Sequence, residues 1–250
     1  MREQIKTFLN NIKIREGAKI LFAVETGSRL WRIESKDSDY DIRFVYVRKL
    51  EDYLRINKLR DVIEFQSKNM DFVGFDIYKF VKLLLNSNPS IIEWLKSDIT
   101  YYDDGKSKKL LLSFIEKNFN PISLYHHYKS MCKSNYLKYI KSGNLMTYKK
   151  YLYALRGLIN AKWVLKKNRI PPTNFLVVKD SPFLPQKIKS KLNEVLDLKK
   201  KGREKDIAKN LKIFDEYIEN FLKEEPKILS KKIIDYSEIQ NYILQLVKKG

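Results

Sequence analysis

The chain has 250 residues, and its 50 Lys and Arg against 30 Asp and Glu give a formal net charge of +20 at pH 7. Apolar residues make up 44% of the sequence, which is enough for a hydrophobic core and excludes a disordered protein. The single cysteine excludes an internal disulfide. The N-terminus does not resemble a signal sequence, and no apolar run approaches the roughly 20 residues that cross a bilayer. We therefore expect a cytoplasmic protein with no membrane contact.

Hydrophobic periodicity alternates between helix and strand in the first part of the chain. In chain order the predicted elements are a helix over 4–14, strands over 19–24, 41–47, 62–65 and 72–75, and a helix over 77–85. The first two strands are apolar or rich in β-branched and aromatic residues, as in a buried sheet. A short polar turn joins the last two strands. We expect a small sheet in strand–helix–strand order, with mixed rather than purely parallel pairing.

The rest of the chain shows helical spacing almost throughout. The predicted helical segments are 91–95, 110–119, 124–140 and 148–167, with Pro-containing loops at 171–172 and 181–185. We therefore predict an α+β fold, with an α/β domain over residues 1–104 and a basic helical domain over residues 105–250.

The positive charge is concentrated in the second half. Residues 1–120 hold 22 Lys or Arg against 18 Asp or Glu, whereas residues 121–250 hold 28 against 12. Such a surplus favours a polyanionic partner, with nucleic acid the leading candidate. The alternative is a lysine-rich genome composition, because charge alone indicates association and not activity.

Two short motifs carry the candidate chemistry. Gly27-Ser28 follows a predicted buried strand and offers backbone N–H groups and a hydroxyl where a phosphate can approach closely. Asp39 and Asp41 open the next strand, and alternation along an extended strand points both to the same side. Two neighbouring carboxylates repel each other unless a cation lies between them, and Mg²⁺ prefers carboxylate and phosphate oxygens. Each motif alone is typical of turns and solvated strand ends, but the two together predict a metal–triphosphate site.

The segment from Gly27-Ser28-Arg29 to 38–47 (SDYDIRFVYV) resembles the predicted nucleotidyltransferases of the DNA polymerase beta-like superfamily, and in particular the branch often encoded beside RNA ligases. The resemblance continues through 74–79, 88–95 and 149–156. One departure is Arg32, where the family usually has a small residue, and this affects the expected nucleotide preference more than the reaction class.

The resemblance implies a catalytic domain over residues 1–104 that performs two-metal nucleotidyl transfer. Asp39, Asp41 and a third carboxylate would hold Mg²⁺, or Mn²⁺ in its place. We expect Asp76 to be the third catalytic and metal-binding carboxylate, since it ends a predicted strand in a segment that resembles the family. The alternative for Asp76 is the N-cap of the following helix. Asp71 and Glu64, on the same predicted hairpin, are the other choices.

Nucleotide contacts are expected from two places. The first is the Gly27-Ser28-Arg29 bend. The second is the helix over 148–167, whose candidate side chains are Lys149, Lys150, Tyr153 and Arg156. Lys149, Tyr153 and Arg156 share one helix face, where cations can meet phosphates and an aromatic ring can stack on a base. The alternative is an ordinary amphipathic helix with core tyrosines and solvated cations.

We therefore expect an enzyme that moves a nucleoside monophosphate from an NTP to an acceptor hydroxyl and releases pyrophosphate. An RNA end, such as that of a tRNA, is the leading acceptor. The alternatives are nucleotidylation of a protein or small-molecule hydroxyl, and a catalytically silent nucleic-acid-binding module.

Overall fold

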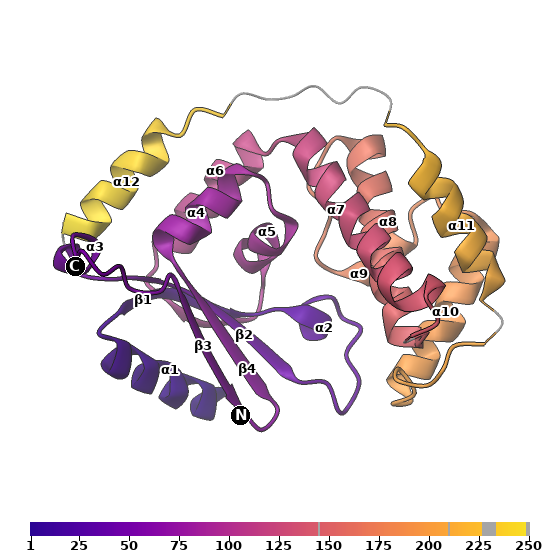
Figure 1. Cartoon of the computed structure of the whole chain (residues 1–250), viewed down its shortest axis with the longest axis horizontal. Coiled ribbons are helices and arrows are strands. Elements are labelled where there is room, and N and C mark those ends of the chain that lie inside the picture. Colours follow the sequence, from indigo (N-terminus) through magenta and orange to yellow (C-terminus); the bar gives the residue numbers. More distant parts are fainter. Residues whose placement is uncertain (145, 210, 227–233, 249–250) are drawn as a thin grey trace. The chain divides into compact units, whose positions relative to one another are not determined.

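The computed structural model describes residues 1–144, 146–209, 211–226 and 234–248 (Figure 1). The chain folds as two compact units. Unit 1 contains Met1–Leu30, Asp39–Phe119 and Ile233–Gly250, and unit 2 contains Trp31–Ser38 and Asn120–Lys232.

Unit 1 is built on a five-stranded sheet. Its strands are β1 (Lys19–Glu25), β2 (Tyr40–Val47), β3 (Val62–Ser67), β4 (Met70–Asp76) and β5 (Thr100–Asp103). Their order across the sheet is β3-β4-β2-β1-β5, in which only β2 and β4 run parallel. The predicted α+β class and mixed pairing are therefore confirmed. The short β5 was not predicted.

Helices cover both faces of this sheet (Figure 1). The helices of unit 1 are α1 (Arg2–Glu16), α2 (Gly27–Leu30), α3 (Leu50–Tyr53), α4 (Ile77–Leu85), α5 (Pro89–Lys96), α6 (Ser107–Asn118) and α12 (Ser237–Lys248). Helix α1 buries Ile5, Leu9 and Ile12 in a core cluster with one sheet face. On the other face Phe80 of α4 packs edge-on against Phe22 of β1. Burial from both sides explains why β1 reads as a nearly continuous apolar run.

The boundary between the units differs from the predicted division at residue 104. Helix α6 packs against β1 and α5, so it belongs with the sheet. Helix α12 returns to the same unit, and the hydroxyls of Tyr242 and Ser107 are hydrogen-bonded at 2.5 Å. Periodicity identifies such helices but contains no signal for the unit on which they pack.

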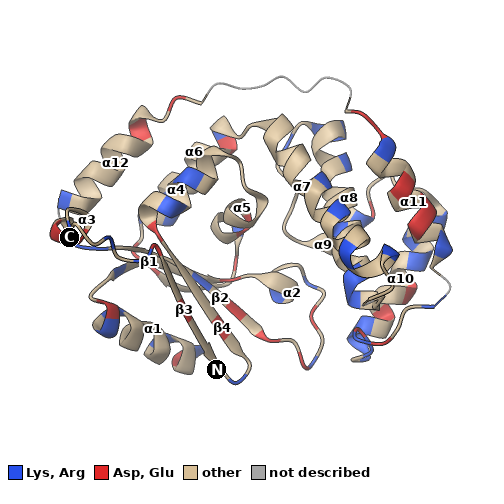
Figure 2. Cartoon of the chain, in the orientation of Figure 1, with Lys and Arg blue, Asp and Glu red and all other residues tan. Residues whose placement is uncertain are grey.

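Unit 2 is helical. Its elements are α7 (Pro121–Asn135), the π-helix η1 (Tyr136–Lys141), α8 (Tyr148–Lys167), α9 (Phe175–Lys179), α10 (Gln186–Lys200) and α11 (Lys212–Lys223). The predicted helix over 124–140 is thus divided at Tyr136. Lys and Arg recur along α8 and α10 (Figure 2). Within the described ranges, no helix has the length and apolar character needed to span a membrane.

Candidate active site

The bend after β1 lies directly against Asp41. Gly27 has a φ of +63°, and a Cβ built on it would lie 2.0 Å from Oδ2 of Asp41. The backbone N–H of Thr26 donates to the carbonyl oxygen of Asp41 at 2.9 Å, which ties the bend to β2. Only glycine satisfies both the left-handed conformation and this close approach. The predicted proximity of Gly27 to the Asp-x-Asp strand is confirmed, with half-buried Ser28 following in the first turn of α2.

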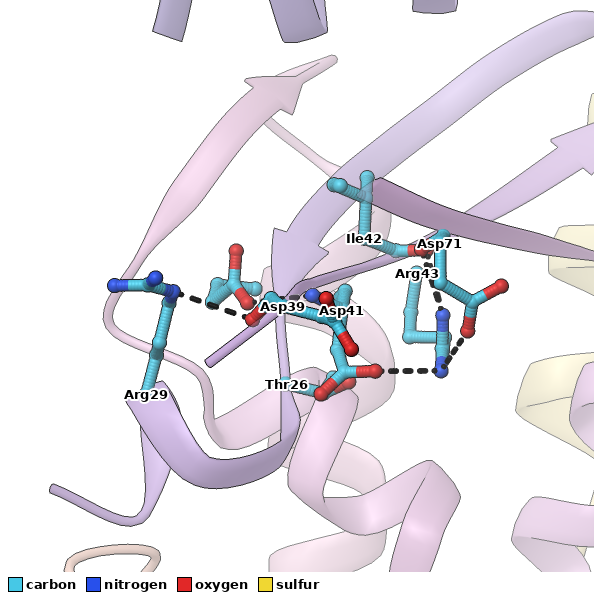
Figure 3. A network of polar contacts seen from close by, with 8 residues as sticks. Thr26, Arg29, Asp39, Asp41, Ile42, Arg43 and Asp71 are labelled. Atoms are coloured by element: carbon cyan, nitrogen blue, oxygen red, sulfur yellow. Dashed lines mark hydrogen bonds and ion pairs between the residues drawn. The ribbon is translucent and has the colours of Figure 1, made fainter. Parts of the chain in front are cut away.

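Asp41 and Asp71 face each other across the parallel β2–β4 pair, in register. Nη2 of Arg43 lies between the two carboxylates, 3.2 Å from Oδ1 of Asp41 and 2.8 Å from Oδ2 of Asp71 (Figure 3). Arg43 shares the Asp41 side of β2 because the two residues are two positions apart. The two acidic side chains are thus held together by a cation that the chain itself supplies.

Asp39 and Arg29 lie at the entrance to β2. Asp39 is exposed, immediately before the first residue of the strand, and its carbonyl oxygen accepts a hydrogen bond from Nε of Arg29 at 3.3 Å. The guanidinium carbon of Arg29 is 3.8 Å from the centroid of the Tyr40 ring. Arg29 therefore lies beside the Asp-x-Asp segment, as shown in Figure 3.

Asp76 is elsewhere. It is in register with Tyr46, five positions along β2 from Asp41, which is roughly 16 Å at 3.3 Å per residue. Its Oδ1 accepts the N–H of Tyr78 as the N-cap of α4, and its Oδ2 accepts the hydroxyl of Tyr53. The prediction that Asp76 lies beside Asp39 and Asp41 is therefore wrong.

The alternative Asp71 takes the place expected of Asp76, because β4 begins at Met70 and runs parallel to β2. Glu64 lies on the outer strand β3, in register with Val73. The register between β2 and β4 determines which of these carboxylates faces Asp41. Spacing along the sequence does not reveal that register.

A buried carboxylate not singled out from the sequence supports Asp41 from behind. Glu25, the last residue of β1, is fully buried. Its Oε1 accepts the backbone N–H of Asp41 at 2.8 Å, and its Oε2 accepts the hydroxyl of Tyr101 at 2.5 Å. Burial raises the pKa of Glu25 above its ordinary value, and these hydrogen bonds oppose the shift. A charged residue closing an otherwise apolar strand was the available sequence signal.

Glu25→Gln should change how stability depends on pH. Because the folded-state pKa of Glu25 is raised, its contribution to stability is fully present below the unfolded value near 4.5 and is lost as pH rises through the folded pKa. We expect the wild type to lose stability relative to Glu25→Gln as pH rises above 4.5, measured by urea unfolding of both proteins. An unchanged difference would contradict the burial of an ionisable Glu25.

The candidates on α8 belong to unit 2 and are packed there. Nζ of Lys149 is 3.2 Å from Oε1 of Glu204. The guanidinium carbon of Arg156 is 3.6 Å from the centroid of the Trp31 ring, and Tyr153 packs edge-on against the same ring.

Lys150 of α8 places its Nζ 3.7 Å from the centroid of the Tyr139 ring. The predicted shared face of Lys149, Tyr153 and Arg156 agrees with these contacts. Their binding of nucleotide stays a prediction.

The donor set suits a hard divalent cation. Among the described residues, no three Asp, Glu, His or Cys side chains are gathered in a metal-binding arrangement. However, the carboxylates of Asp41 and Asp71 face each other beside the Gly27 bend and already accept one bridging cation, the guanidinium of Arg43. Oxygen ligands of this kind fit Mg²⁺.

Comparison with known proteins gives the family of the chain. Residues 1–245 match the family RlaP, the RNA repair pathway DNA polymerase beta family. The chain is 36% identical over 220 residues to the uncharacterised protein YcgL of Bacillus subtilis, covering 88% of this chain and 84% of YcgL. It is 32% identical over 117 residues to the uncharacterised protein MJ0002 of Methanocaldococcus jannaschii, covering 45% and 47%.

Among solved structures, the chain is similar to spectinomycin adenyltransferase AAD(9) from Enterococcus faecialis, determined with ATP and spectinomycin. The TM-score is 0.51 at 11% identity, and the match covers 89% of this chain and 98% of that one. At this identity the likeness concerns the fold alone. The chain therefore belongs to the RNA repair pathway DNA polymerase beta family and is a nucleotidyltransferase of the polymerase beta-like kind.

Proposed function

We propose that this nucleotidyltransferase moves a nucleoside monophosphate from an NTP to the hydroxyl of an RNA end. The observation that supports the proposal is the Asp41–Asp71 pair beside the Gly27 bend, because facing carboxylates next to a glycine bend suit a metal–triphosphate. The RNA acceptor is supported by the family to which the chain belongs and by the surplus of Lys and Arg in residues 121–250.

In the proposed reaction, Asp39, Asp41 and Asp71 would hold Mg²⁺, or Mn²⁺ in its place. When bound, the metal neutralises charge on the triphosphate and lowers the pKa of the acceptor hydroxyl. Gly27 and Ser28 bind phosphate oxygens at the bend, and Arg29 adds positive charge at its edge. The acceptor oxygen forms a bond to the α-phosphorus, the bond to the β-phosphate oxygen breaks, and pyrophosphate leaves while the hydroxyl proton passes to solvent.

For unit 2, we propose that side chains of α8 also contact nucleotide. Lys149 and Lys150 would supply charge for the β- and γ-phosphates, Tyr153 would stack on the base, and Arg156 would make bidentate phosphate contacts. Lys149 must then exchange its ion pair with Glu204 for a phosphate contact.

The test is label transfer from each α-³²P-labelled NTP in the presence of Mg²⁺, with RNA, with the protein alone, and with small hydroxyl compounds. We expect label on RNA, and far less label after Asp41→Asn. Label on the protein itself or on a small molecule would show that RNA is not the acceptor, but it would still support nucleotidyl transfer. RNA binding with steep salt dependence, no Mg²⁺ requirement and no label transfer from any NTP would instead favour the catalytically silent binding module.

A further inference from the structure

Arg43 contacts the candidate site with both of its terminal nitrogens: Nη2 binds carboxylates, and Nη1 binds backbone oxygens. Nη2 lies between the carboxylates of Asp41 and Asp71 (Figure 3). Nη1 donates to two backbone carbonyl oxygens, that of Ile42 at 3.1 Å and that of Asp71 at 2.9 Å. The guanidinium is therefore fixed by main-chain acceptors, which an arriving metal ion leaves unchanged.

The contacts of Arg43 are also unequal. It binds Asp71 through both the backbone oxygen and the carboxylate, and the carboxylate contact is 0.4 Å shorter than the contact with Asp41. Two parallel contacts from a rigid guanidinium define a side-chain direction as well as an attraction. Oδ1 of Asp71 has no hydrogen-bond partner among the described residues, so one oxygen is held while the other is available.

We propose that Arg43 is a positioning residue that holds Asp71 as the third metal-binding carboxylate of the site. On metal binding, the contact between Nη2 and Asp41 gives way, whereas the contacts with Asp71 and Ile42 remain. Asp41 then turns its carboxylate to the ion, and Asp71 presents Oδ1 from a fixed position. This inference rests on the proposed function, since it assigns Arg43 a part in the same two-metal site.

The competing interpretation is that Arg43 only occupies the cation position until a metal ion displaces it. The two interpretations predict opposite effects of substitution. If Arg43 competes with the metal, removing it raises metal affinity, because a positive charge beside the ligands is lost. If Arg43 positions Asp71, even Arg43→Lys lowers occupancy, since one ammonium cannot make the same paired contacts.

The experiment counts Mn²⁺ ions bound per full-length chain by electron paramagnetic resonance, with a non-hydrolysable NTP present. We expect two ions for the wild type and about one for Arg43→Lys and Arg43→Gln. In steady-state assays, kcat should fall by about 10- to 100-fold, as is typical when the partner of a ligand is lost. The KM for NTP should change little, because Asp39 and Asp41 would still hold the metal ion that binds the triphosphate.

Arg48→Lys is the matched control. Arg48, just beyond the other end of β2, makes the same kind of paired contact, to the carbonyl oxygen of Glu16 at 2.6 Å and to its carboxylate at 3.5 Å. This variant reports the structural cost of replacing a paired arginine and should bind two Mn²⁺ ions. Equal or tighter Mn²⁺ binding by Arg43→Lys would overturn the inference, whereas a wild type that binds no Mn²⁺ and transfers no label would instead overturn the proposed function.

Discussion

Asp41→Asn is expected to lower nucleotide transfer by about 10³-fold while the fold is retained. Asn keeps the shape of Asp41 but loses the negative charge that a divalent cation requires. A metal ion contributes several kcal/mol of charge stabilisation to such a transition state. A loss of about 4 kcal/mol corresponds to roughly 10³ in rate. The measurement is single-turnover label transfer, with circular dichroism to verify the fold.

Asp76→Asn is the matched control for this change. Asn is as good an N-cap as Asp, so the start of α4 is retained. We expect transfer within a few-fold of wild type for Asp76→Asn, and a loss for Asp71→Asn comparable to that of Asp41→Asn. The reverse result, with Asp76 essential and Asp71 dispensable, would contradict the assignment that the strand register gives.

Gly27→Ala is the second change with a large expected effect. Its Cβ would lie 2.0 Å from Oδ2 and 2.9 Å from Cγ of Asp41, so the carboxylate must move. The left-handed backbone adds about 1–2 kcal/mol of strain for alanine. We expect a lower urea midpoint and a loss of transfer of about 10²-fold or more, since displaced catalytic groups are costly.

Gly17→Ala separates the two causes. Gly17 has nearly the same φ, +58°, at the C-cap of α1, but an added Cβ there meets no atom within 4 Å. The Gly17→Ala variant should lose about as much free energy of unfolding as Gly27→Ala through backbone strain, but it should keep the wild-type transfer rate. If both variants kept the wild-type rate, the contact between the Gly27 bend and Asp41 would have no part in the reaction.

Local signals predicted much of unit 1. The strands β1 and β2 are strongly apolar, and Asp76 caps the helix that follows it, which was the alternative given for this residue. The strand β5 has four residues, of which two are exposed, so its composition did not distinguish it from a loop. Helices α6 and α12 pack in unit 1 and not with the other helices after residue 104, because helix packing depends on contacts distant in sequence.

The candidate site was predictable up to the point where it required pairing between strands. The closeness of Gly27 to Asp41 follows from motif spacing, whereas metal binding by Asp39 and Asp41 stays a prediction. Asp71 depends on the parallel register of β2 and β4, and Glu25 on the burial of its strand end. Arg43 lies two residues after Asp41, but its contact with Asp71 needs the same register.

The most direct test is a crystal structure with Mn²⁺ and a non-hydrolysable NTP, in which anomalous scattering locates the metal. The account predicts peaks within about 2.0–2.3 Å of carboxylate oxygens of Asp39, Asp41 and Asp71, with the triphosphate at the Gly27 bend. Peaks at Asp76, or an NTP bound away from Asp41 with no metal between them, would contradict it.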